Sequence, residues 1–471
     1  MSFAFCDLRY FMLKLYNTLS RKIEDFAPLN PPHVGMYSCG PTVYDYTHIG
    51  HLRKYVGDDI LRRILEVNGY EIKHVMNITD VGHLVSDEDA GEDKMEKGAR
   101  ESGRSVWEVA KFYEDYFWKS VETVNTKRPN VVAKATEHIK EQIKLIHRLE
   151  KNGFIYITEH AIYFDISKFS DYIKLSGQKL EEKEAGTRAD VFIDKQKKNS
   201  QDFALWFFTV GHFKDHTMRW PSPWGEGFPG WHIECSAMSM EYLGDSFDIH
   251  TGGIDHIPVH HTNEIAQAEA ASGKQFVKYW VHHNFLIVDS EKMSKSKKNF
   301  YRAEELQGKG FDPLALRYLF LTTHYRDKLN FTWESLVAAQ NALNNLRETI
   351  REWEQPKIGC AEFEQKFMNA VNNDLNTPQA LAVMWDMVKS NNPSSAKAKS
   401  ILEMDKVLGL KLDECLGKKI EVPEEVQKLV AHRENARKSG DFKKSDDLRH
   451  KIKKLGFEIE DTSTGPRIKK I

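Results

Sequence analysis

The stretch Tyr37-Ser-Cys-Gly-Pro-Thr-Val-Tyr-Asp-Tyr-Thr-His-Ile-Gly-His51 decides the fold, because it joins a predicted strand to a predicted helix. The strand is expected at residues 33–39 and ends at a Gly-Pro pair. Apolar residues then recur at helical spacing over residues 49–67, after which an Asn-Gly pair ends the helix. A second strand is expected at residues 72–78. This order predicts a parallel βαβ unit with its ligand site at the carboxyl ends of the strands.

The rest of the chain continues this α/β fold with one interruption. A predicted hairpin at residues 154–164 indicates an inserted subdomain, and the Rossmann-like parallel fold is expected to resume near Phe203. Residues 84–101 are polar and acidic and are expected to form a loop. Beyond residue 312 the periodicity is helical and predicts a bundle. The expected parts are an N-terminal extension (1–14), the first half of the parallel-sheet domain (15–125), the insertion (126–202), the second half (203–312), a helical bundle (313–417) and a small basic C-terminal domain (418–471).

Composition places the chain among globular proteins. Its 471 residues suffice for two to four domains, and its content of 41% apolar and 29% charged residues fits a packed core. The five cysteines form no CxxC pair, which argues against a disulfide framework and suits a reducing compartment. No apolar run reaches the roughly 18 residues of a membrane span, and the N-terminus lacks a signal-peptide pattern. We therefore expect a cytoplasmic protein that does not engage a membrane.

A second informative region, residues 230–264, gathers thiol, imidazole and carboxylate groups. It contains Gly230-Trp-His-Ile-Glu-Cys235, then His250-Thr-Gly-Gly-Ile-Asp255, then His260-His-Thr-Asn-Glu264. His260 and Glu264 are four residues apart in a predicted helix, so both side chains are expected on one face. Zinc accepts cysteine, histidine and glutamate as ligands. The pattern indicates a metal site beside a nucleotide pocket, although an ordinary polar helix start has the same local spacing.

Two basic segments indicate contact with phosphates. The loop that contains Lys292-Met-Ser-Lys-Ser296 follows a predicted strand at residues 279–288 and can reach a polyphosphate, but solvated charge runs look the same. Residues 418–471 hold fifteen Lys or Arg against ten Asp or Glu. Such an excess suits a partner that carries phosphates, and also suits simple soluble helices.

Taken together, the motifs resemble a known family. Thr47-His48-Ile49-Gly50-His51 and Lys292-Met293-Ser294-Lys295-Ser296 resemble the HIGH and KMSKS motifs of class I aminoacyl-tRNA synthetases. Residues 37–51, 230–238 and 260–267 resemble the cysteinyl-tRNA synthetases in particular, and the likeness runs from about Leu15 to Thr464. It implies a Rossmann-like catalytic domain with a connective insertion, followed by a helical region for the tRNA stem and the anticodon.

The resemblance also implies a reaction and its partners. ATP, accompanied by Mg²⁺, activates L-cysteine to cysteinyl-adenylate, and the acyl group then passes to the 3′ end of tRNA(Cys). A monomer is expected. One zinc ion selects the substrate thiolate, which removes the need for a separate editing domain, because the softness of a sulfur ligand distinguishes cysteine from serine.

Each site residue is carried over from the family motifs. The implied catalytic groups, which meet the ATP phosphates, are His48, His51, Lys292 and Lys295. The other implied ATP contacts are Gly40, Thr42, Gly50, Gly252, Gly253, Asp255 and Ser294. The implied zinc ligands are Cys39, Cys235, His260 and Glu264, and the implied cysteine pocket includes Thr79 and Trp231. For Trp231, a role as an ordinary core aromatic stays open.

Two other functions are compatible with parts of the sequence. A ligase of the same catalytic fold couples activated cysteine to the amine of a glycoside, as in mycothiol biosynthesis, but it has a reduced C-terminal region. A catalytically silent RNA-binding protein with zinc would have no need for the phosphate-binding residues His48, His51, Lys292 and Lys295.

Overall fold

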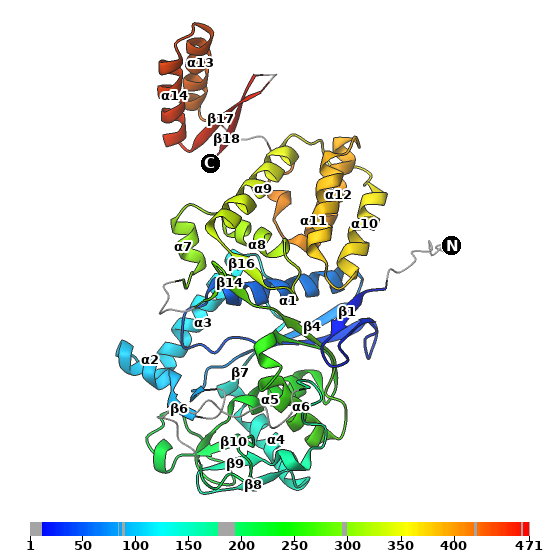
Figure 1. Cartoon of the computed structure of the whole chain (residues 1–471), viewed down its shortest axis with the longest axis vertical. Coiled ribbons are helices and arrows are strands. Elements are labelled where there is room, and N and C mark those ends of the chain that lie inside the picture. The colour runs from blue at the N-terminus through cyan, green and yellow to red at the C-terminus, as the bar shows by residue number, and fades with distance from the viewer. Residues whose placement is uncertain are drawn as a thin grey trace, which may run out of the picture.

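The computed structural model describes residues 12–82, 84–86, 90–177, 194–293, 299–418, 422–462 and 465–470. A parallel five-stranded sheet lies at the centre, in the order β13-β12-β3-β4-β7 (Figure 1). Its strands are β3 (His33–Ser38), β4 (Glu71–Ile78), β7 (Val131–Lys134), β12 (Phe247–Gly253) and β13 (Val277–His283). The expected α/β fold with a parallel sheet is confirmed. A hairpin of β1 (Lys14–Asn17) and β2 (Lys22–Asp25) precedes the sheet.

Helix α1 (Ile49–Val67) connects β3 to β4, as the βαβ pattern predicts. Its apolar side, which includes Leu52, Val56 and Ile60, is buried. His48 caps its N-terminus, because the His48 Nδ1 atom accepts hydrogen bonds from the backbone N–H groups of Gly50 (3.0 Å) and His51 (3.3 Å). Figure 1 shows α1 on the side of the sheet that faces the helical bundle.

The segment between β4 and β7 differs from the expected loop. It contains a hairpin of β5 (Leu84–Ser86) and β6 (Ala90–Asp93), and helices α2 (Lys94–Ser102) and α3 (Val106–Thr123). The side chain of Asp93 accepts hydrogen bonds from the N–H groups of Met95 and Glu96 and so starts α2. The loop expected at 84–101 was wrong because an exposed helix can be as polar as a loop, and its N-cap aspartate is easily read as one more acidic residue.

The inserted subdomain is larger than the sequence predicts. Helix α4 (Ile139–Lys151) leads into an antiparallel sheet in the order β11-β10-β9-β8, formed by β8 (Ile155–Ile157), β9 (Ala161–Phe164), β10 (Phe203–Phe208) and β11 (Gly227–Pro229). Because β10 pairs with β9, the boundary at 202/203 is wrong and the insertion continues to β11. The error arose because the run Phe-Ala-Leu-Trp-Phe-Phe is apolar throughout, which is typical of a strand in a central parallel sheet. In the structure all six residues are indeed buried, but in the antiparallel sheet of the insertion.

After the insertion, helices α5 (Trp231–Leu243) and α6 (His260–Ser272) return the chain to the parallel sheet. They pack together on the face opposite α1 (Figure 1). A small sheet of β14 (Leu286–Val288), β15 (Glu291–Lys292) and β16 (Leu329–Phe331) follows. The short helical turns include Ala135–His138, Ile166–Lys168, Gly211–Phe213, Ile254–His256 and Leu412–Glu414.

The C-terminal part is helical, as expected. Its helices are α7 (Ala303–Gly308), α8 (Pro313–Leu321), α9 (Trp333–Arg351), α10 (Ala361–Asn372), α11 (Thr377–Lys389) and α12 (Ser394–Leu408). The last domain contains α13 (Glu424–Lys438), α14 (Phe442–Lys454), β17 (Phe457–Thr462) and β18 (Gly465–Lys470) around a core of its own. Among the described residues, no helix combines the length and the apolarity that crossing a membrane requires.

Candidate active site

Four side chains with metal-binding atoms meet at the carboxyl end of β3. Cys39 follows β3, Cys235 lies on α5, and His260 and Glu264 lie one turn apart on α6. Their candidate ligand atoms lie within 4.8 Å of one another, and His260 Nε2 is 3.0 Å from Glu264 Oε1. Each side chain is at least 97% buried, since the largest exposed fraction is 3%, at Cys39. The structure thus brings together the four residues that the family resemblance implies.

The charges of these groups suit a cation. Burial raises the pKa of both thiols, and for Cys235 the neighbouring Cys39 and Glu264 raise it further. Burial alone would lower the pKa of His260, but Glu264 and Cys235 raise it to about 10. Burial alone would raise the pKa of Glu264, but His250 and His260 outweigh this effect and lower the pKa to about 2. Glu264 Oε1 is buried, and its ion pair with His260 leaves its hydrogen-bond geometry unsatisfied. A zinc ion would satisfy that oxygen and would convert both thiols to thiolates.

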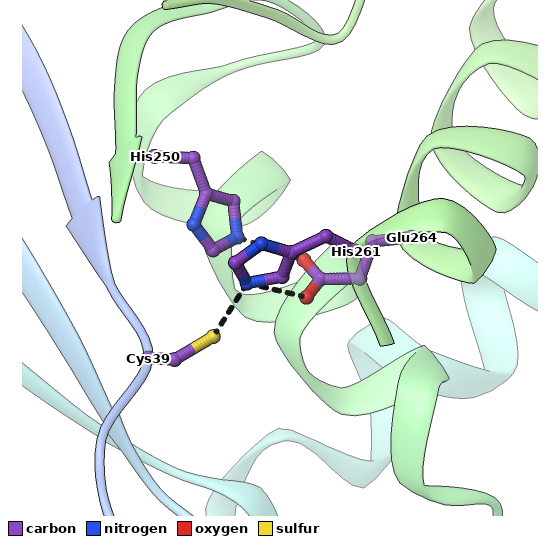
Figure 2. A group of neighbouring side chains, drawn as sticks. All are labelled: Cys39, His250, His261 and Glu264. Carbon is purple, nitrogen blue, oxygen red and sulfur yellow. Dashed lines mark hydrogen bonds and ion pairs between the residues drawn. The ribbon is translucent and has the colours of Figure 1, made fainter. Parts of the chain in front are cut away.

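A second group shares two of these residues (Figure 2). It consists of Cys39, His250, His261 and Glu264. His250 Nε2 lies 2.9 Å from Glu264 Oε2, and His261 Nε2 lies 3.3 Å from Cys39 Sγ. The first group supplies two thiols and therefore suits zinc better than the second, which supplies one. In that arrangement His250 and His261 orient Glu264 and Cys39 from outside the ligand set.

Thr79 and Trp231 lie near the same centre. The Thr79 hydroxyl donates a hydrogen bond to Glu234 Oε2 at 2.9 Å, and Thr79 is 1% exposed. The Trp231 ring stacks on the His260 ring with centroids 4.3 Å apart. Sequence reasoning did not identify Glu234 as the partner of Thr79. In the sequence, Glu234 is visible only as a carboxylate between Trp231 and Cys235. Its contact with Thr79 could not be predicted, because no residue spacing relates α5 to the end of β4.

The expected ATP residues surround the start of α1. The rings of His48 and His51 stack with centroids 3.5 Å apart. Gly40 lies against β4 so closely that a Cβ atom there would be 1.7 Å from the carbonyl oxygen of Asn77. A Cβ atom at Gly252, near the end of β12, would be 2.4 Å from the His261 ring, so a larger residue there would displace that ring. Thr42 bridges to Thr79 across the strand ends, Gly253 ends β12, and Asp255 lies in the helical turn that follows.

Both ends of the basic loop reach the same helix terminus. The Met293 side chain lies 3.1 Å from the position that a Cβ atom would occupy at Gly50. On the other side of the loop, Phe300 packs edge-on against the His48 ring, and the Tyr301 carbonyl accepts a hydrogen bond from the N–H of Ile49 at 2.9 Å. Lys292 ends β15. Ser294 and Lys295 lie outside the described residues, so their expected roles stay predictions.

Comparisons with known proteins show first the fold and then the class. The chain is similar to a Mycobacterium tuberculosis methionyl-tRNA synthetase in complex with methionyl-adenylate, with a TM-score of 0.55 and 15% identity, over 80% of this chain and 90% of that one. Residues 25–341 match the model of the class I tRNA synthetase (C) catalytic domain. The chain therefore has the fold and the catalytic domain of a class I aminoacyl-tRNA synthetase.

The more specific family follows from the remaining matches. Residues 366–417 match the DALR domain, and residues 420–466 match the anticodon-binding domain of cysteinyl-tRNA ligases. The chain is 49% identical to cysteine–tRNA ligase 1 of Burkholderia lata, over 97% of this chain and 96% of that protein, and 45% identical to a cysteine–tRNA ligase of Treponema denticola, over 98% and 100%. The chain belongs to the cysteine–tRNA ligase family.

Proposed function

We propose that the chain joins L-cysteine to tRNA(Cys) in two ATP-dependent steps and recognises cysteine through zinc. The observation that carries the proposal is the meeting of two thiols, an imidazole and a carboxylate beside the N-terminus of α1. The first step requires an anion-binding site next to a thiol-binding site. The helix terminus provides the former, since its free backbone N–H groups favour phosphate.

In the first step the cysteine carboxylate attacks the α-phosphorus of ATP, and pyrophosphate leaves. His48 and His51 are placed beside the phosphates by the first turn of α1, where His48 is fixed through its Nδ1 atom. The close packing at Gly40 and Gly252 lets the backbone approach the nucleotide. Lys292 and Lys295 stabilise the charge that develops on the phosphates. Mg²⁺ accompanies the ATP.

Cysteine is held by its thiol. Cys39, Cys235, His260 and Glu264 would hold a zinc ion, which supplies a soft positive centre for the substrate thiolate. Trp231, stacked on His260, and Thr79 form the adjoining walls of the pocket. In the second step a ribose hydroxyl at the 3′ end of the tRNA attacks the acyl carbon and AMP leaves. The match of residues 420–466 supports tRNA rather than a glycoside amine as acceptor. A monomer in the cytoplasm completes the proposal.

The test is ATP–pyrophosphate exchange that depends on cysteine. The zinc-loaded chain should catalyse exchange with cysteine and not with serine, and Cys235→Ser should lose bound zinc and exchange together. Cys415→Ser is the control, because Cys415 is also buried but lies after α12, far along the chain from the four ligands. A folded, zinc-loaded chain without exchange, or full exchange by a chain that binds no zinc, contradicts the proposal. Transfer of cysteine to a glycoside amine instead of tRNA would support the alternative ligase.

A further inference from the structure

A buried ion pair on α1 reaches the backbone of the candidate metal ligand Cys39. The ammonium of Lys54 donates a hydrogen bond to the Cys39 carbonyl at 2.5 Å and lies 2.7 Å from Asp58 Oδ2. The side chains of Lys54 and Asp58 are only 14% and 2% exposed. Lys54 also lies 4.7 Å from the centre of the Tyr55 ring, where a cation is attracted by the ring face.

The ion pair is anchored to the sheet on its other side. Asp58 Oδ1 lies 2.9 Å from Nε2 of His283, the last residue of β13. The fit depends on Gly57, since a Cβ atom there would lie 2.4 Å from the His283 ring. Burial alone would raise the pKa of Asp58, but Lys54 and His283 outweigh it and lower the pKa, so the carboxylate stays charged. The three residues therefore form one fixed unit between α1 and the sheet.

The hydrogen bond from Lys54 adds to two others that hold the backbone at Cys39 and Gly40. The Cys39 N–H donates to the Thr251 carbonyl at 3.1 Å, and the N–H of Gly40 donates to Asn77 Oδ1 at 2.7 Å. Both of those partners belong to neighbouring strands of the sheet. Lys54 comes from the helix whose N-terminus forms the ATP site, so it joins the thiol ligand directly to that helix.

Helix stability alone does not account for Lys54. Ion pairs four residues apart favour an isolated helix more when the acid precedes the base, and here Lys54 precedes Asp58. Burial of the pair also carries a desolvation penalty that apolar residues would avoid. The hydrogen bond to the Cys39 carbonyl is therefore the interaction that explains a buried ammonium at this position.

We propose that Lys54, held by Asp58 and His283, is a positioning residue that fixes Cys39 for metal and cysteine binding. This proposal rests on the proposed function, because it concerns the zinc site described there. Removal of an outer partner of a metal ligand weakens metal binding about 10- to 100-fold in comparable sites. We expect the same range for Lys54→Met, which keeps an unbranched side chain only one atom shorter and removes its charge.

Zinc affinity, measured by competition with a chromogenic chelator, tests the proposal. The control is Arg62→Met, which removes another ion pair of α1, with Glu66, away from the site. A double variant, Lys54→Met/Asp58→Asn, removes the buried charge but leaves an amide oxygen for His283, so it separates positioning from folding. Both Lys54 variants should bind zinc about 10- to 100-fold more weakly and show a similar rise in KM for cysteine in pyrophosphate exchange, with KM for ATP unchanged within about twofold.

Four outcomes would overturn the proposal. Zinc affinity of Lys54→Met equal to that of Arg62→Met excludes a role at the metal site. Recovery of both stability and zinc affinity in the double variant shows that Lys54 acts only through folding. If the unmodified chain binds no zinc, both the metal assignment and the proposal for Lys54 are wrong. If the unmodified chain and Lys54→Met bind zinc equally well, only the proposal for Lys54 is wrong.

Discussion

At the scale of single residues, the site depends on close approaches that only glycine permits. Gly40 lies between Cys39 and the nucleotide side of the site, and a Cβ atom there would overlap the Asn77 carbonyl. Gly35 lies in β3, five residues before Gly40, but a Cβ atom at that position would be 3.4 Å from Leu243 and Phe247, which is ordinary contact. The two glycines thus form a matched pair for mutation.

We expect Gly40→Ala to separate β3 from β4 locally and to displace Cys39. Overpacking of this kind costs about 1–3 kcal/mol in the free energy of unfolding. The thermal midpoint should fall, and zinc content and cysteine-dependent exchange should fall with it. Gly35→Ala should change each of these measurements only slightly. Equal behaviour of the two variants would show that the approach at Gly40 has no role in the site.

The residues of the candidate site differed in how far they could be predicted from the sequence. The spacing of His260 and Glu264 on one helix face was visible locally. Cys39 was assigned only through the family resemblance, because no periodicity relates the end of β3 to α6. Lys54 and Glu234 were missed, since a buried charged side chain looks like a surface one until its partners are known.

At the scale of elements, two networks fasten α1 to its surroundings, and one of them reaches the bundle. Arg317 of α8 is fully buried, and its Nη2 atom lies 2.7 Å from Asp59 Oδ2 of α1. Its Nε atom donates to the carbonyl of Leu408 at the end of α12, at 2.6 Å. Arg63 shares the Asp59 carboxylate at 2.6 Å. Helix α1 and the bundle are therefore linked through buried charges.

We expect Arg317→Met to destabilise the chain by about 3 kcal/mol, the lower end for loss of one partner of a buried ion pair, because Arg63 still pairs with Asp59. Lys366→Met in α10 is the control, since its partner Glu362 is exposed and such pairs contribute about 0–1 kcal/mol. Urea unfolding followed by tryptophan fluorescence measures the difference. A shift no larger than that of the control would contradict the importance of the network.

The same network predicts a dependence on pH. Burial would raise the pKa of Asp59, but Arg317 and Arg63 lower it below its ordinary value of 3.8. The contribution of Asp59 to stability is therefore complete above that value and is lost as the pH falls below it. In Arg317→Met the loss of stability at low pH should be smaller and should end at a higher pH, because with one of the two cations gone the pKa of Asp59 lies closer to its ordinary value.

Elements with a clear period were predicted well. The bounds of α1 agree with the pattern of apolar residues, and the chain beyond residue 312 is helical as its periodicity predicts. The errors lie at α2, whose polar surface hides its helical character, and at β10, whose buried faces do not reveal which sheet it joins. Strand pairing is a long-range property, and residues 203–208 alone carry no information about β9.

At the scale of the whole molecule, catalysis and tRNA binding lie in separate parts of the chain. The C-terminal domain has a core of its own, formed by Val426, Val430, Ile452, Phe457 and Ile459. Because this domain has its own core, we expect the catalytic fold to stay intact when the domain is removed. The order of the domains was predicted from sequence, whereas the true extent of the insertion required the pairing of β10.

We expect a chain that ends after residue 418 to retain cysteine-dependent pyrophosphate exchange and to charge tRNA poorly. The KM for tRNA should rise about tenfold or more, since a loss of only about 1.4 kcal/mol of binding has that effect. Steady-state aminoacylation and exchange assays on the same preparation measure both activities. Equal loss of exchange and charging would mean that the two parts do not work separately.

The place of β3 in the middle of the sheet has a consequence for biosynthesis. Cys39 leaves the ribosome about 225 residues before Glu264, because the insertion and the second half of the sheet lie between them. At about 5–20 residues per second, this delay is roughly 10 to 45 seconds. During that interval β12 is not yet present to cover one edge of β3, and the Cys39 thiol is without its partner ligands. The Cys39 thiol must therefore stay reduced during this interval, and the proposed zinc ion would be acquired only when most of the catalytic domain has been made.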